Sequence, residues 1–160
     1  MAIERTLVLL KSDAVERGLV GEIIKRFENV GLKIIAMKLV KPTRELAKKH
    51  YKVHVDKPFY PGLEQYLTSG PVIAMVLEGV NAIAVVRKLI GSTEPHKAQP
   101  GTIRGDFAHV TFSHADESGK AVKNLIHASD SVESAEYEIS VWFDPQEIVE
   151  YELVHEKHTR

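Results

Sequence analysis

The feature that most constrains the fold is an alternation of short apolar runs with segments whose apolar residues recur at helical spacing. Three of the runs have the length of a strand and span 6–10, 33–41 and 72–77. The last is entirely apolar, which predicts a central place in a sheet. Between Gly18 and Gly31, and again between Asn81 and Gly91, the spacing predicts amphipathic helices that end at glycine.

Shorter segments complete this pattern. Further helices are predicted over 43–51, over 59–67 and from Asp130 to just before Pro145. Asp130 is the expected N-cap of the last helix, with Glu133 completing a capping box. A short fourth strand is predicted over 123–128, after the irregular stretch 92–105. The order of elements predicts an α+β sandwich, in which helices pack on a mainly antiparallel four-stranded sheet.

Composition restricts the classes of function. The chain has 160 residues, of which 44% are hydrophobic and 27% charged, so we expect one globular domain over 1–160. It has no cysteine, which excludes disulfides and thiolate chemistry. The sequence shows no signal-peptide pattern and no membrane-length apolar run, so we expect a cytoplasmic protein without membrane contact. A net charge of −1 argues against dedicated nucleic-acid binding.

The densest cluster of functional residue types surrounds His127. The sequence lacks P-loop, dinucleotide-binding, zinc-ligand and serine-hydrolase patterns, so candidate residues stand singly at the ends of elements. His127 closes the predicted fourth strand, and Glu138 lies on the helix that follows. A neutral imidazole with one nitrogen held by an acceptor is a competent nucleophile near pH 7. Because the chain has eight histidines, position alone favours a structural or surface role.

A second cluster is cationic. Lys11 directly follows the first strand, Arg87 lies on the predicted helix before Gly91, and Arg104 lies near Thr93 in the irregular stretch. Guanidinium groups bind phosphate oxygens in a fork, and lysine adds a point charge. The alternative is that these are solvated surface groups. Two aromatic residues, Tyr51 and Phe59, are candidates for the wall of a pocket, although aromatic residues at this spacing are more often core.

The run from Asn124 to Asp130, continued by 131–136, resembles the active-site signature of nucleoside diphosphate kinases. Further segments resemble motifs of that family in the same order and span 4–11, 17–23, 69–72 and 100–106. Together the matches cover about residues 4 to 151, nearly the whole chain. This coverage outweighs the structural alternatives for the individual residues.

The resemblance implies a ferredoxin-like α+β fold and a ping-pong reaction, in which a nucleoside triphosphate phosphorylates His127 and a nucleoside diphosphate then takes the phosphoryl group. The residues that it places around the phosphates are Lys11, Tyr51, Arg87, Thr93 and Arg104. It places Asn124, with Lys11, at the ribose and Phe59 on one face of the base. It also implies that Ser129 and Glu138 orient the imidazole. It also implies Mg²⁺, held chiefly by nucleotide phosphates, and a homo-oligomer, most often a hexamer.

The sequence departs from the family pattern in three places. Ser12-Asp13-Ala14 stands where members commonly have Pro-Asp-Gly, and Ala128 replaces a glycine. About ten extra residues lie between Phe107 and Lys123, a feature associated with archaeal members. We expect this inserted segment, at about 110–120, to be a peripheral hairpin over a subunit contact or the nucleotide entrance. The residue that forms the second wall of the base slot is left open among Val110, Phe112, Ala121 and Val122.

Two other functions are weighed. Residues 104–112 superficially resemble the aromatic RNA-binding strand of RNA-recognition domains. Asp106 stands where that strand has an aromatic residue, and the net charge of −1 also argues against RNA binding. A catalytically inactive interaction protein on the kinase fold is the other alternative. It is weakened because His127 and the phosphate-binding residues are all present.

Overall fold

The computed structural model describes residues 3–160, and its centre is an antiparallel sheet in the order β2-β3-β1-β4. The strands are β1 (Ile3–Leu10), β2 (Lys33–Val40), β3 (Val72–Val80) and β4 (Ile126–Ala128). β3 lies between β2 and β1, which confirms the central place predicted from its unbroken apolar run. The arrangement is the ferredoxin-like α+β fold that the resemblance implied.

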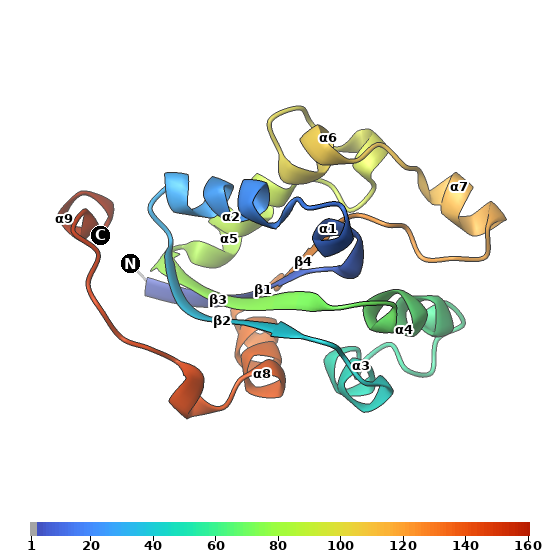
Figure 1. The fold of residues 1–160 in the computed structure, drawn as a ribbon, viewed down its shortest axis with the longest axis horizontal. Helices are drawn as coiled ribbons and strands as arrows, with labels where there is room; N and C mark the ends of the chain where they lie inside the picture. The colour runs from blue at the N-terminus through green and yellow to red at the C-terminus, as the bar shows by residue number, and fades with distance from the viewer. Residues whose placement is uncertain (1–2) are drawn as a thin grey trace.

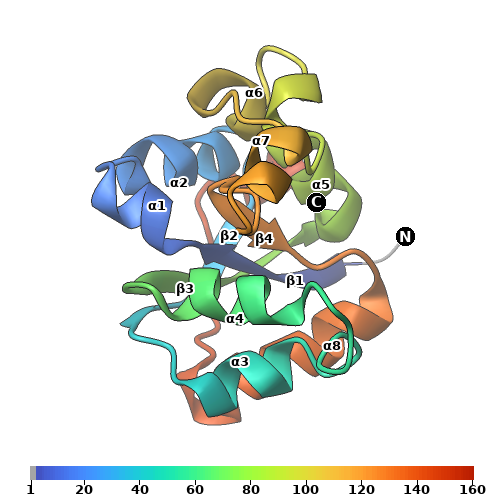
Figure 2. The ribbon, with the colours of Figure 1, turned by 90° about the vertical axis from the view of Figure 1, so that its right-hand side faces the viewer.

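Helices cover both faces of this sheet (Figures 1 and 2). They are α1 (Ser12–Glu16), α2 (Val20–Asn29), α3 (Arg44–His50), α4 (Tyr60–Thr68), α5 (Ala82–Ile90), α6 (Ile103–Phe107), α7 (Phe112–Glu117), α8 (Val132–Trp142) and α9 (Glu156–Thr159), with 3-10 turns at Pro95–Lys97 and Pro145–Glu147. In both views α2 and α5 lie on one face, and α3 and α8 lie on the other.

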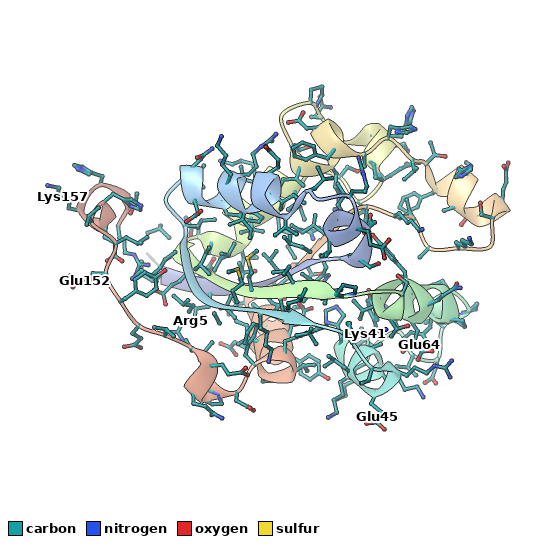
Figure 3. The ribbon with its side chains drawn as sticks, viewed as in Figure 1. Arg5, Lys41, Glu45, Glu64, Glu152 and Lys157 are labelled. Atoms are coloured by element: carbon teal, nitrogen blue, oxygen red, sulfur yellow. The ribbon has the colours of Figure 1, made fainter. Side chains whose placement is uncertain are left out.

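Two hydrophobic clusters join the layers, because alternate residues of each strand point to opposite faces. On the α2 and α5 side, Val8 and Leu10 pack with Phe27. On the α3 and α8 side, Leu7 and Leu9 pack with Trp142. Figure 3 shows side chains filling the spaces on both sides of the sheet. In residues 3–160 we find no helix with the length and apolarity needed to span a membrane.

The register of β1 fixes the position of the candidate nucleophile. β1 pairs with β3 over its whole length, and its last residues pair with β4, where Leu9 lies opposite His127. β4 is shorter than the predicted strand over 123–128. Leu125 has a φ of 73°, a left-handed conformation that is strained for a leucine and incompatible with an extended strand. The chain therefore turns sharply just before His127.

One predicted helix start is corrected, and one helix was not predicted. Ser131, and not Asp130, is the N-cap of α8, because its hydroxyl accepts the hydrogen bond from the amide of Ser134. α1, directly after Lys11, was not predicted, since five residues are too few to show a helical period. The cap at Thr43 is confirmed by its bond from the amide of Leu46 at 3.1 Å.

The inserted segment contains helix α7, so the predicted hairpin is wrong. α6 ends at Phe107, and α7 follows after four residues. The first amides of α7 are satisfied by acceptors: Thr111 accepts from His114, and the buried Glu94 carboxylate accepts from Phe112 at 3.0 Å. These bonds favour a helix over a strand. Residues 103–107 and 112–117 are helical, so residues 104–112 do not form the RNA-binding strand that they superficially resemble.

The candidate active site

A cavity of about 610 Å³ is lined in part by residues of α4 and α7. These two helices lie at the same end of the molecule (Figure 1). The residues that the sequence placed around a nucleotide all line it: Lys11, Tyr51, Phe59, Arg87, Thr93, Arg104, Asn124 and His127. They come from segments spread over more than a hundred residues of the chain. The fold therefore brings both candidate clusters, the histidine and the cations, to one cavity.

One ring nitrogen of His127 is hydrogen-bonded to the carboxylate of Glu138. Its Nε2 lies 2.8 Å from Oε1 of Glu138, and the hydroxyl of Ser129 donates to the same oxygen at 2.7 Å. Because this oxygen acts as the acceptor, Nε2 carries the ring proton and Nδ1 retains its lone pair. Ser129 is itself fixed, since its hydroxyl accepts from the amide of Leu7 on β1. The predicted orienting residues thus engage Nε2 and leave the lone pair on Nδ1.

Lys11 is buried beside the loop that precedes β4. Its Nζ donates to Oδ1 of Asn124 at 3.1 Å and lies 4.7 Å from the centre of the Tyr66 ring. Burial, with a smaller contribution from the neighbouring Arg104, lowers the pKa of this ammonium group to about 7. An anion in the cavity would favour the charged form.

The two arginines hold the backbone around His127. Arg104 is buried and donates to the carbonyls of Gly91, Asn124 and Ile126. Arg87 donates to the carbonyl of Ala128 at 3.2 Å. Burial lowers the pKa of Arg104 to about 10, and the like charge of Arg87 adds to this effect. Two cations that repel each other across a cavity form a favourable site for a polyanion.

The turn before β4 is fixed by residues that sequence reasoning missed. The Tyr66 hydroxyl donates to Asp13 at 2.6 Å and accepts from the amide of Asn124 at 3.1 Å. Asp13 also accepts from the amide of Leu125 at 3.1 Å. These bonds hold Leu125 in its strained conformation, and strain of this kind often occurs at functional sites. The one available signal was Asp13 itself, an acidic residue two positions after the candidate lysine.

The outer part of the cavity is aromatic. Phe59 is 53% exposed and Phe112 is 43% exposed, and both line the cavity. Of the residues left open for the second wall, Phe112, Ala121 and Val122 line it, whereas Val110 lines a smaller cavity with His114. The inserted segment thus contributes part of the wall.

Residues 4–148 match the family model described as "Nucleoside diphosphate kinase". The nucleoside diphosphate kinase of Pyrococcus furiosus is 56% identical over 149 residues, which cover 93% of this chain and 88% of the relative. That of Pyrococcus horikoshii is 57% identical over 148 residues, covering 92% of this chain and 90% of the relative. The chain belongs to the nucleoside diphosphate kinase family. It is therefore a phosphotransferase, and archaeal kinases are among its relatives, as the sequence suggested.

Solved structures agree with this assignment. A nucleoside-diphosphate kinase from Borrelia burgdorferi, described as a transition state mimic with bound vanadate and ADP, has a TM-score of 0.95 at 42% identity. The match covers 98% of this kinase and 96% of that chain. The halophilic kinase from Halobacterium salinarum in complex with CDP has a TM-score of 0.87 at 43% identity, covering 98% of both chains.

One histidine cluster in this kinase resembles a metal site. His50, His127 and Glu138 have potential ligand atoms within 4.8 Å of one another. However, Trp142 Nε1 donates to His50 Nδ1 at 3.1 Å, and Nε2 of His127 is engaged by Glu138. A metal would have to displace the bond between His127 and Glu138 beside a cluster of cations. We therefore assign the cluster to orientation of the imidazole.

Proposed function

We propose that this nucleoside diphosphate kinase works through a phosphohistidine at His127. Nδ1 attacks the terminal phosphorus of a nucleoside triphosphate, so an N–P bond forms while the P–O bond to the departing diphosphate breaks. A terminal phosphate oxygen of a second nucleoside diphosphate then attacks the same phosphorus and restores the imidazole. The observation that carries the proposal is that Glu138 engages Nε2 of His127, so the lone pair is on Nδ1 of a histidine that lines the cationic cavity.

The cavity supplies what phosphoryl transfer requires of a protein, which is alignment and positive charge around the moving group. We assign the phosphates to the residues that line its cationic part, namely Lys11, Tyr51, Arg87, Thr93 and Arg104. Asn124 is assigned to the ribose together with Lys11. Its amide nitrogen donates to the Thr93 carbonyl at 3.0 Å, so it is already rigid without a ligand.

Phe59 is assigned to one face of the base. Its large exposed fraction fits a stacking surface that ordinary packing leaves uncovered. Stacking is sequence-tolerant because every base has a π-face. A site that holds the base in this way accepts many nucleotides, as a kinase of this family requires.

We assign the divalent cation to the substrate and identify it as Mg²⁺. Mg²⁺ prefers oxygen ligands and usually binds through one or two carboxylates and substrate phosphates. Among the lining residues within 3–160, Asp116 on α7 is the one carboxylate, and the other polar side chains besides His127 are cations, hydroxyls and the amide of Asn124. This donor set does not fit a metal held by the protein itself. It fits a cation that arrives on the nucleotide phosphates.

We also propose that the chain is a single kinase domain, with the segment at about 110–120 as an elaboration of it. In this proposal the domain assembles in the cytoplasm as a homo-oligomer, a hexamer. Self-association is supported by the edge strand β2, where Met37 is 54% exposed and Leu39 is 64% exposed. The segment after α8 bonds to this edge at Ile35 through the amide of Val149. Sedimentation equilibrium tests the assembly, and a stable monomer of 17.9 kDa at micromolar concentration contradicts it.

The phosphohistidine is tested with [γ-³²P]ATP. The wild-type protein is expected to gain an acid-labile, alkali-stable label, and H127A to lose both the label and turnover while still binding nucleotide. H114A, which removes an exposed histidine of α7, is the matched control and should keep the label. A label that persists in H127A assigns the carrier to another residue and overturns the proposal.

A further inference from the structure

A second histidine, His50, lies against the candidate nucleophile. It is the last residue of α3 and is buried. Its ring centre lies 4.6 Å from that of His127, and the two rings are nearly perpendicular, at 84°. Its other side contacts Trp142, the one tryptophan of the chain, at 5.7 Å between ring centres. His50 thus forms a bridge between the nucleophile and helix α8.

The bond from Trp142 selects one tautomer of His50. An indole N–H can only donate, so Nδ1 of His50 must carry a lone pair, and the proton of the neutral ring is on Nε2. Burial, together with the nearby His127, keeps the pKa of His50 well below its usual value. His50 is therefore a neutral ring of fixed orientation.

His127 is consequently restrained in two directions. Glu138 holds one atom of its ring, Nε2, which by itself still permits the ring to tilt about that contact. The perpendicular ring of His50 packs against it and opposes such a tilt. Among residues 3–160, the side chains that line the cavity include His127 but not His50. His50 thus contacts the nucleophile without lining the nucleotide cavity.

We propose that His50, fixed by Trp142, is a positioning residue that keeps the plane of the His127 imidazole aligned for attack on phosphorus. The inference rests on the proposed role of His127 as the phosphoryl carrier. Its physical basis is that transfer rates depend steeply on the alignment of the reacting atoms, and an error of about 1 Å can cost about a hundredfold in rate. The indole–imidazole bond ties that alignment to the packing of α8 on α3.

The chain offers a matched pair of variants to test this. W142F removes the bond from α8 to His50, and Y137F removes a neighbouring bond between the same two helices, from the Tyr137 hydroxyl to the Lys49 carbonyl at 2.6 Å. H50N keeps an acceptor for Trp142 and removes the ring. The rate of His127 phosphorylation is measured in a single turnover with [γ-³²P]ATP, and the dissociation constant is measured with ADP.

W142F and H50N are expected to phosphorylate at least about tenfold more slowly, with an ADP dissociation constant within about twofold of wild type. Y137F should match wild type in both quantities. Equal losses in W142F and Y137F would attribute the effect to helix docking and overturn the proposal, as would unchanged rates or a loss confined to ADP affinity. If W142F does not fold, the phosphorylation rate of H50N is compared with that of Y137F, and this comparison tests the proposal. A wild-type protein without label would instead refute His127 as carrier.

Discussion

Replacing Glu138 by glutamine should slow the phosphorylation of His127 by about 10- to 150-fold. The carboxylate oxygen accepts from both His127 and Ser129, at 2.8 and 2.7 Å. A hydrogen bond to a charged group contributes about 1.5–3 kcal/mol, and each 1.36 kcal/mol of barrier is tenfold in rate. Glutamine keeps the shape but loses the charge, and its NH₂ group can face the imidazole and favour the wrong tautomer. The loss should therefore appear in the rate of transfer.

The assay is a quenched-flow single turnover with [γ-³²P]ATP, read as acid-labile label on the protein. E133Q is the matched control, because Glu133 lies on the same helix and is exposed. Thermal unfolding of both variants separates a misfolded protein from a misaligned imidazole. A folded E138Q that is phosphorylated at the wild-type rate would refute the view that the carboxylate fixes the tautomer.

Three further outcomes follow from the site. Because the pKa of Lys11 is lowered to about 7, nucleotide binding at pH 8 should take up a proton, seen by calorimetry in buffers of different ionisation enthalpy and lost in K11M. Between pH 7 and the ordinary lysine pKa of 10.5, the unfolded chain binds more protons at Lys11 than the folded chain does. The contribution of Lys11 to the free energy of unfolding therefore rises with pH across that window. R104A leaves three carbonyls without their donor, so urea titration should show that the free energy of unfolding falls by about 2–4 kcal/mol. The fall should be smaller for R87A, which loses one such bond, and equal falls would contradict this. Deleting 114–120, or changing Phe112 to alanine, should weaken nucleotide binding several-fold in equilibrium titrations but preserve the phosphoenzyme; a folded oligomer that cannot be phosphorylated would show the segment to be catalytic.

The sequence by itself determined the sheet and its main helices. The strand at 72–77 and the helix that ends at Gly91 are visible because hydrophobic periodicity is a local property, set by which face of each element is buried. The candidate nucleotide-binding residues were named from the family motifs in the sequence, and the fold brings them to one cavity. The inserted segment was not, since its helix depends on Glu94, a partner outside the segment that accepts from the amide of Phe112.

The support around His127 was decided by tertiary structure alone. Trp142 and His50 are 92 positions apart, and the bonds that Asp13 accepts from Tyr66 and Leu125 span 53 and 112 positions. Side-chain hydrogen bonds of this kind need distances and angles within narrow limits. Those limits are met only when α8 packs on α3 and α4 packs beside α1. No local spacing encodes that packing, so the sequence alone does not distinguish the buried His50 from the other seven histidines.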